Sequence, residues 1–412
     1  MEQMDHPWLR HGRDQDSIRI NVQQEVRGLR NCPRAFAWAI PANKLISTES
    51  LNFGYTNLLT LPININRGGR DRLSGKIVIN NNQISSDILI SVIMSVYNEK
   101  ESELKLAIES ILNQTFKMFE FIIILDNPTN KSVLRLLKHY SMYDKRINVL
   151  VNKKNLGLAN SLNKGIKIAK GKYIARMDAD DISVLNRLEK QFNFLEDNKN
   201  YDVVATDRLD INESGELIDT SYLVVNSFDD IKSILPFGSV ITHPSVLMRK
   251  SFILSMNGYR NFKAAQDYDL WLRLITSGYK VKVLPDKLIY YRIRNSGISL
   301  SNPYKRYLYS KYARKLYLQR RKSGQDDYSE DNLSEFLLRK KFFNQDYTDR
   351  YNKAYNYLFL GVNKIKKREV IKGITMIIFA LFMHREMFET LYLASKFSAK
   401  LKDISAHSIK KN

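Results

Sequence analysis

Residues 172–181 read KYIARMDADD, an apolar segment that ends in three acidic residues. The composition from Tyr173 to Met177 is typical of a buried β-strand. Side chains two positions apart in an extended chain point the same way, so Asp178 and Asp180 are expected to converge on one point. Close carboxylates repel one another unless a cation offsets their charge. A Mg²⁺ or Mn²⁺ ion, completed by phosphate oxygens of a substrate, meets that need.

The same acidic residues allow a simpler interpretation. Asp is a preferred N-cap residue, so an isolated Asp-X-Asp tripeptide is most often the start of a helix. The position of Asp178 and Asp180 after a hydrophobic strand, within a repeating pattern of strands and helices, favours the metal site instead.

Strand-like and helical segments alternate on both sides of this stretch. The predicted strands cover residues 88–96, 121–125, 147–151 and 173–177. Helical periodicity occurs over residues 104–112 and 133–140, after residue 157, and at Leu185, Leu188, Phe192 and Leu195. This alternation predicts an α/β fold with a mostly parallel sheet flanked by helices. Ligands bind at the carboxyl ends of such strands, which directs attention to Asp126 and to the acidic residues at 178–181.

The chain divides into three predicted parts. They are an irregular N-terminal extension over residues 1–86, an α/β domain over 87–300 and a basic helical region over 301–412. The composition of the 412 residues, 44% hydrophobic and 26% charged, is that of a globular protein. The one cysteine, Cys32, excludes an intrachain disulfide and indicates a reducing compartment. The first 30 residues contain no apolar segment followed by a cleavage site, so no secretory signal is expected.

Positive charge is concentrated towards the C-terminus. The net charge is +22, and from residue 300 onward there are 24 Lys and Arg against 11 Asp and Glu. Such an excess favours nucleic acid, anionic lipid or phosphorylated substrates as partners. The apolar stretch ITMIIFALFM over residues 374–383 follows a basic cluster at 364–368. It is shorter than the ~20 residues that span a bilayer. It is therefore expected to lie in a membrane interface, or to be buried in a helical hairpin or dimer contact.

Two more acidic positions have the surroundings of functional residues. Asp126 ends the strand 121–125 before a loop-forming sequence, where it could accept hydrogen bonds from a base or ribose, or cap a turn. Residues 264–274 read AAQDYDLWLRL, with Asp267 at the start of a helix that has an apolar face. The helix dipole is expected to favour the ionised carboxylate of Asp267, which could then act as a general base. A plain helix cap is the alternative.

Together these segments resemble the family-two inverting glycosyltransferases with a GT-A fold, especially bacterial enzymes that build capsular or exopolysaccharide repeat units. The resemblance covers about residues 88–300, and the order of its motifs is more specific than any one of them. The motifs are ISVIMSVYNE (90–99), SILNQTF (110–116), EFIIILD (120–126), NLGLANSLNKG (155–165), GKYIARMDADD (171–181), His243-Pro244, QDYDLW (266–271) and Tyr291 to Ser299.

The resemblance implies a role for each matching position. Asp178 and Asp180 would hold Mn²⁺ or Mg²⁺ on the donor diphosphate, with Asp180 the more direct ligand. Asp267 would be the catalytic base, and His243 and Trp271 are candidates for the acceptor site. The implied nucleotide-sugar-binding residues are Ser95, Tyr97, Glu99, Asp126, Asp178, Arg294 and Ser299.

Three positions depart from the family pattern. Ser95 stands where proline is usual, Asn127 replaces the second Asp of a common pair, and Gln266 replaces the Glu beside Asp267. The implied partners are a nucleotide-sugar donor, for which a UDP-sugar is expected, and a lipid-linked or oligosaccharide acceptor. The implied location is the cytoplasm, with contact to the inner face of the membrane through the basic C-terminal region.

Two other functions compete with this interpretation. The positive charge and the 23 tyrosines would suit a nucleic-acid-binding protein, but no base-reading module is recognisable and the acidic cluster would repel phosphates without a metal. A sugar nucleotidyltransferase should have a glycine-rich basic loop after its first strand. Here that loop reads Tyr97-Asn98-Glu99.

Overall fold

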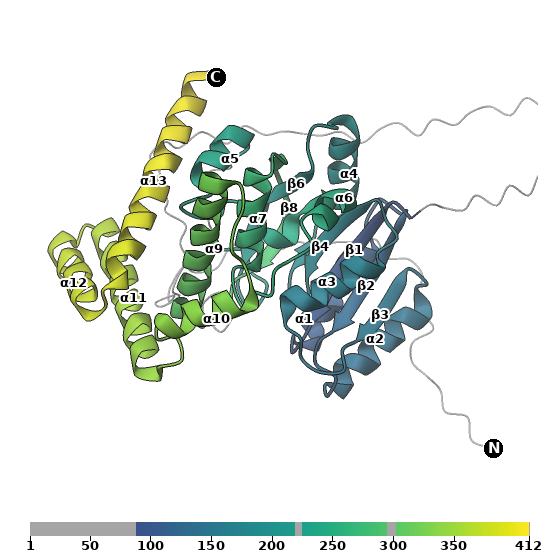
Figure 1. Ribbon diagram of the computed structural model, residues 1–412. Coiled ribbons are helices and arrows are strands. Elements are labelled where there is room, and N and C mark those ends of the chain that lie inside the picture. The colour runs from purple at the N-terminus through teal and green to yellow at the C-terminus, as the bar shows by residue number, and fades with distance from the viewer. Residues whose placement is uncertain (1–87, 219–224, 295–301, 412) are drawn as a thin grey trace, which may run out of the picture. The chain divides into compact units, whose positions relative to one another are not determined.

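The computed structural model describes residues 88–218, 225–294 and 302–411, with side chains described as far as residue 406. The extension predicted over residues 1–86, and Ser299, lie outside the described residues. The described part contains an eight-stranded sheet with the order β3-β2-β1-β4-β7-β6-β8-β5 (Figure 1). The strands are β1 (Ile90–Val96), β2 (Phe119–Leu125), β3 (Ile147–Val151), β4 (Tyr173–Asp178), β5 (Ile182–Ser183), β6 (Val203–Ile211), β7 (Leu247–Arg249) and β8 (Val281–Arg292).

The strands that carry the acidic motifs are neighbours in this sheet. β1 lies between β2 and β4, and β1 to β4 all run parallel. β6 and β8 are parallel to each other, whereas β7 and β5 are antiparallel to their partners. The register places Ser95 beside Asp178 and Val96 beside Leu125. The carboxyl ends of β1, β2 and β4 therefore meet at one end of the sheet, and the predicted mostly parallel α/β sheet is confirmed.

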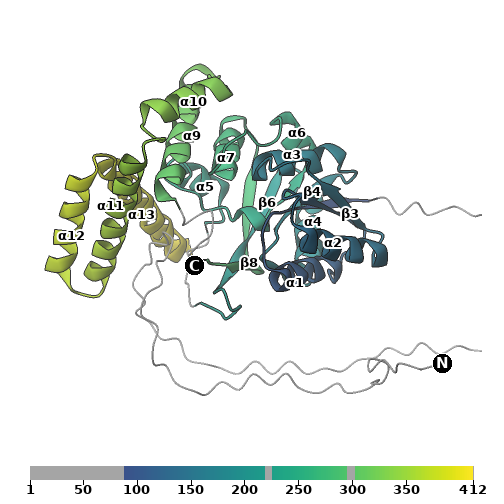
Figure 2. The ribbon, with the colours of Figure 1, turned by 90° about the horizontal axis from the view of Figure 1, so that it is seen from below.

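Helices cover both faces of the sheet because its central strands are apolar on both faces. Ile93 and Ile124 belong to one hydrophobic core, whereas Val92 and Ile123 belong to the other. Helices α3 and α6 lie on the first face, and α1 and α4 on the second (Figure 2). The helices of this region are α1 (Glu101–Leu112), α2 (Lys131–Tyr143), α3 (Leu158–Ile168), α4 (Arg187–Asp197), α5 (Phe228–Ile234), α6 (Lys250–Ser255) and α7 (Gln266–Thr276), with a 3₁₀ turn at His243–Ser245.

One predicted helical position is wrong. Leu185 precedes α4 and is exposed, whereas Leu188 and Leu195 are buried on the inner side of that helix. The chain just before Leu185 forms the short strand β5 against β8, so the helix cannot begin until Arg187.

The region after residue 301 is helical, as predicted. Asn302 caps its first helix, because its side chain accepts a hydrogen bond from the backbone N–H of Lys305. Tyr304 and Tyr351 are buried in the same hydrophobic core as α7. No helix in the described part of the chain combines the length and apolar composition needed to cross a membrane. These helices are α9 (Pro303–Ser323), α10 (Glu330–Arg339), α11 (Gln345–Lys366), α12 (Val370–Met383) and α13 (Glu386–Lys411).

Candidate active site

The acidic end of β4 forms the centre of the candidate site. Asp178 is the last residue of β4, and its carboxylate is ion-paired with Arg176. Asp180 lies in the loop that follows, where Oδ2 is 2.9 Å from Nε of Arg294. The two carboxylate side chains keep 31% and 26% of their surface exposed, so a ligand can reach both.

The chain after β8 closes this end of the sheet. The Nη2 atom of Arg294 lies 2.5 Å from Oε2 of Glu103 in α1, so Arg294 joins Glu103 to Asp180. Burial lowers the pKa of Arg294, but Asp180 and Glu103 more than offset this and raise it above its usual value. Arg292 donates from Nε to the carbonyl oxygen of Asp180 at 2.9 Å. Arg292 and Arg294, more than 100 residues away in sequence, thus hold the loop at Asp180 in place.

The acidic side chains around this loop have raised pKa values, chiefly because they are buried. Burial and then Asp178 raise the pKa of Asp180. Burial, Asp178 and Asp180 raise the pKa of Asp181 well above its usual value. Burial chiefly, with Asp180 and Asp178 contributing, also raises the pKa of Glu99. Arg292 donates its backbone N–H to Oδ1 of Asp181, whereas the buried Oδ2 has no hydrogen-bond partner among the described residues.

A divalent cation fits this donor set only if a substrate completes its coordination. Within the described residues, no group of three or more His, Cys, Asp or Glu side chains is arranged to hold a metal ion. Mg²⁺ is commonly bound by one or two carboxylates together with substrate phosphates and water. The accessible carboxylates of Asp178 and Asp180 supply such a pair. A cation between them would also reduce the repulsion by neighbouring carboxylates that contributes to the raised pKa values of Asp180 and Asp181. The metal remains a prediction.

The positions predicted to bind the nucleotide lie at the ends of β1 and β2. Ser95 is half-buried within β1, and Tyr97 is exposed just after the strand. The backbone N–H of Tyr97 donates to Oε2 of Glu99 at 2.7 Å, which holds Glu99 against its own loop. Asn127 donates from Nδ2 to Oδ1 of Asn98 at 2.6 Å, so the loops after the two strands are tied together.

Asp126 organises the loop before α3. Its Oδ1 accepts hydrogen bonds from Nδ2 of Asn152 at 2.6 Å and from the backbone N–H of Leu156 at 2.8 Å. Its Oδ2 accepts from the backbone N–H of Gly157 at 2.8 Å, and Gly157 has φ +82°, a conformation that favours glycine. Asp126 is buried, and these contacts account for that burial without a ligand. A contact of Asp126 with a base or ribose stays a prediction.

Arg176 is the most informative residue that the sequence interpretation missed. It lies two positions before Asp178 on the same face of β4 and is buried. Burial lowers its pKa, but Asp178 and, to a lesser degree, Tyr259 and Asp181 raise it above its usual value. The charge of Arg176 also acts on Asp267, where it partly offsets the rise in pKa that burial causes. The buried Arg176 therefore acts on both Asp178 and the candidate base Asp267. Its spacing of two residues from Asp178 is the feature of the sequence that could have predicted the first of these contacts.

Asp267 occupies the first turn of α7 and is half-buried. The start of the helix favours the ionised form of Asp267, as expected, but burial is the larger effect and raises its pKa overall. Hydrogen bonds from backbone N–H groups, including that of Tyr268, and the charge of Arg176 oppose the shift without cancelling it. A raised pKa brings a carboxylate closer to the pH at which it would accept protons, which suits a general base. Ala265, just before α7, has φ +55°, an uncommon conformation for a residue with a side chain.

The two acceptor-site candidates are placed differently. His243 is buried; its Nε2 lies 2.8 Å from the hydroxyl of Tyr259. Burial, helped by the charge of Arg176, lowers the pKa of His243 well below its usual value, so its ring is neutral. Trp271 is completely buried and packs edge-on against His243, with ring centroids 6.2 Å apart. This burial removes Trp271 from the residues that could touch an acceptor in this conformation and makes it a supporting residue beneath His243.

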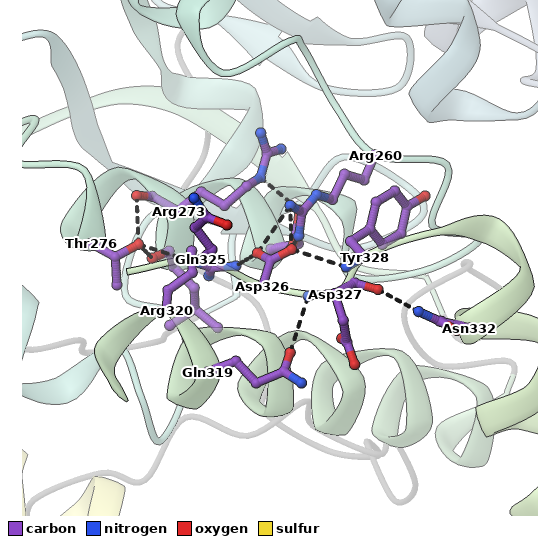
Figure 3. A network of polar contacts seen from close by, with 12 residues as sticks. Arg260, Arg273, Thr276, Gln319, Arg320, Gln325, Asp326, Asp327, Tyr328 and Asn332 are labelled. Carbon is purple, nitrogen blue, oxygen red and sulfur yellow. Dashed lines mark hydrogen bonds and ion pairs between the residues drawn. The ribbon is translucent and has the colours of Figure 1, made fainter. Parts of the chain in front are cut away.

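A second polar network holds the far side of α7. Asp269 is completely buried and is paired with Arg273, at 2.9 Å, and Arg260, at 3.4 Å. Arg260 continues to Asp326, which is also paired with Arg320 of α9 (Figure 3). A surface cavity of about 500 Å³ lies beside these side chains. The network links the loop after α9 to the helix that carries Asp267.

Comparison with known proteins identifies the family of this chain. The model of "Glycosyl transferase family 2" matches residues 91–254. An uncharacterised glycosyltransferase of Methanocaldococcus jannaschii is 40% identical over 57% of this chain and 81% of its own length. The O-antigen biosynthesis glycosyltransferase WbnJ of Escherichia coli is 36% identical over 52% of this chain and 83% of its own.

Among solved structures, Staphylococcus aureus TarS (residues 1–349) in complex with UDP-GlcNAc matches with a TM-score of 0.47 and 17% identity, over 79% of this chain and 92% of that chain. The two sequence relatives are each covered over most of their length, and the family model spans β1 to α6, including the acidic end of β4. The chain therefore belongs to glycosyl transferase family 2.

Proposed function

We propose that this glycosyltransferase transfers a sugar from a nucleoside diphosphate sugar to a hydroxyl group of a glycan acceptor, with inversion at the anomeric carbon. The observation that carries the proposal is the pair of accessible carboxylates at the end of β4, where Asp178 is paired with Arg176 and Asp180 with Arg294. The two acidic centres of the site, Asp178 and Asp267, share two neighbours, Arg176 and Tyr259. Asp178 contributes to the raised pKa values of both neighbours. Asp267 contributes to the raised pKa of Tyr259, and the charge of Arg176 opposes the rise in the pKa of Asp267. A donor diphosphate near Asp178 would therefore lie in the same electrostatic environment as a base at Asp267.

The donor would be held at the carboxyl ends of β1, β2 and β4. The loops at Tyr97 and Asp126 would receive the nucleoside, and the loop at Asp180 would receive the diphosphate. Arg294 is within 2.9 Å of Asp180 and supplies positive charge beside the departing diphosphate. A Mg²⁺ or Mn²⁺ ion held by Asp178 and Asp180 would add further stabilisation of the charge on that leaving group.

Transfer requires that a proton leaves the acceptor. Asp267 would accept this proton from the attacking hydroxyl while the hydroxyl oxygen bonds to the anomeric carbon. The bond from that carbon to the diphosphate oxygen breaks at the same time, and its electron pair leaves with the diphosphate. Attack from the face opposite the leaving group inverts the configuration.

The relatives suggest the pathway in which the acceptor occurs. The Escherichia coli relative is described as an O-antigen biosynthesis enzyme, and a Bacillus subtilis relative, EpsE, is described as a putative glycosyltransferase. We extend the first description to this chain and propose polysaccharide biosynthesis, with a lipid-linked acceptor at the inner face of the cell membrane.

The proposal is tested by incubating the purified chain with a panel of nucleoside diphosphate sugars, beginning with UDP-sugars, and measuring release of the nucleoside diphosphate. We expect one donor to be turned over, EDTA to abolish turnover and Mn²⁺ to restore it. Asp180→Asn should reduce turnover by at least about 10²-fold, whereas Asp197→Asn, an exposed change in α4, should not. Turnover of no donor in the panel, or full turnover in EDTA, would contradict the corresponding part of the proposal.

A further inference from the structure

Helix α12 exposes an unusual row of large apolar side chains. Ile371 and Phe382 are 83% and 86% exposed, and Ile374 and Ile378 are each nearly half exposed. These four positions follow one another at intervals of three or four residues, so they lie along one face of the helix. We name Ile371, Ile374, Ile378 and Phe382 the apolar stripe.

The opposite face of α12 explains why the stripe points outward. A Cβ atom on Gly361 would lie 2.7 Å from the carbonyl oxygen of Gly373, and a Cβ atom on Gly373 would lie 2.6 Å from that of Gly361. The two glycines therefore let α11 and α12 approach closely, with Ile377 and Ala380 turned inward. Helices α11 and α12 lie side by side (Figure 1), and the apolar stripe is on the face of α12 away from Gly373 and Ala380.

Cations gather where α11 turns into α12. Lys367 and Arg368 are exposed, and the side chain of Lys372 is 76% exposed at the start of the stripe. Glu369 is the acidic residue of this turn, and it is paired with Lys364 and Lys372. The turn therefore carries a net positive charge directly beside the exposed apolar side chains.

We infer that the apolar stripe and this basic turn form a docking surface for a bilayer that contains anionic lipid. Exposed apolar side chains along a helix can insert between lipid headgroups while neighbouring Lys and Arg contact the negative surface. The 14-residue α12 spans about 21 Å, less than the ~30 Å hydrocarbon core, so it would lie along the surface rather than cross it. The inference deepens the proposed function, because it would place the enzyme where a lipid-linked acceptor is found.

Flotation of the full chain with vesicles tests the surface. We expect binding to vesicles of phosphatidylcholine with phosphatidylglycerol, and at least 10-fold weaker binding to phosphatidylcholine alone. Combining Ile371→Ser, Ile378→Ser and Phe382→Ser should weaken binding to the anionic vesicles at least 10-fold. The matched control combines Leu318→Ser, Leu338→Ser and Phe343→Ser, which are also exposed but lie outside α12. This control should bind like the wild type.

A charge variant separates the two parts of the surface. Combining Lys367→Gln, Arg368→Gln and Lys372→Gln should weaken binding about 10-fold at low salt and flatten its salt dependence. The same change at Lys131, Lys138 and Lys145, which are exposed in and after α2, should leave binding unchanged.

Three outcomes would overturn the inference. They are a wild-type chain that does not float, serine variants at the stripe that bind normally, and serine variants whose defect is conversion of a dimer to a monomer. The last outcome would mean that the stripe contacts a second copy of the chain. Donor turnover in solution is measured on the same samples. Because the stripe variants should retain it, loss of membrane binding is distinguishable from failure of the proposed enzymatic function.

Discussion

Two aspartates in the first turn of α7 have opposite surroundings. Asp269 is completely buried between Arg273 and Arg260, and the network continues to Asp326 (Figure 3). Asp267 is also desolvated, but it forms no ion pair with any described residue, and burial raises its pKa. Asp269 is thus paired with cations, whereas Asp267, on the same helix, has no ion-pair partner among the described residues.

The acids near Asp269 and those at the end of β4 differ in the same way in the direction of their pKa shifts. Burial alone would raise the pKa of Asp326, but Arg260 and Arg320 lower it below its usual value. At the end of β4, burial and the carboxylate of Asp178 raise the pKa of both Asp180 and Asp181. Two arginines outweigh the burial of Asp326, whereas Arg294, which is paired with Asp180, does not outweigh its burial and the neighbouring carboxylate. Acids whose pKa stays raised in this way are candidates for a functional role. The comparison therefore distinguishes acids that stabilise the fold from acids that we propose to be functional.

The largest expected effect is the loss of transfer on changing Asp267→Asn. An amide cannot accept the proton of the acceptor, so kcat/KM should fall about 10³-fold, within the usual range for loss of a general base. Donor binding, measured by calorimetry, should be retained because Asp267 would contact the acceptor. An Asp267→Asn enzyme that turns over like the wild type would show that Asp267 is not the catalytic base.

The second prediction concerns the structural side. Asp326→Asn leaves Arg260 and Arg320 without their shared carboxylate and should cost about 3 kcal/mol of unfolding free energy. Denaturant unfolding measures this loss, and donor turnover of the folded variant should change by less than a few-fold. Asp327→Asn is the matched control, since Asp327 and its partner Lys315 are both 45% exposed and such pairs contribute about 1 kcal/mol or less. Equal losses in the two variants would contradict the structural role.

Replacing the buried cation that links the two acidic centres should have an intermediate effect. Arg176→Met removes the partner of Asp178 and the charge that lowers the pKa of Asp267. We expect kcat/KM to fall about 10²-fold and the acidic limb of the pH–rate profile to move to higher pH. Arg176→Lys keeps the charge and should restore the position of that limb. A lower rate with an unchanged pH profile would make Arg176 a packing residue only.

The last prediction concerns how the pH changes the effect of each substitution on stability, and the two aspartates should differ in sign. The raised pKa of Asp267 means that ionising it destabilises the folded chain, so Asp267→Asn should raise Tm at pH 7 to 8. The lowered pKa of Asp326 means that its ionised form stabilises the fold, so Asp326→Asn should lower Tm there. Both differences should shrink as the pH falls towards 4 and below, where the carboxylates of the unfolded chain become protonated. Thermal scans across this range should show the Tm of each variant approaching that of the wild type at low pH. Shifts in Tm of the same sign for the two variants at pH 7 to 8 would contradict the opposite roles of Asp267 and Asp326.

Much of the fold could be predicted because it depends on local periodicity. The apolar runs at β1 and β2 are nearly continuous because both faces of these strands are buried. The error at Leu185 arose because β8, about 100 residues later in the chain, pairs with the segment just before it. Likewise, Trp271 has a functional-looking position in its motif, yet its burial depends on the elements that pack around α7.

The sequence by itself determined where the acidic residues lie, because a strand alternates its side chains and parallel strands end together. Only the tertiary structure decided which acids are neutralised. Arg294, which pairs with Asp180, is more than 100 residues away in sequence, and Arg260, one of the two partners of Asp269, lies outside α7. Burial of Asp267 depends on the whole surrounding core. The direction of a pKa shift is the sum of desolvation and distant charges, and neither can be read from residues adjacent in the chain.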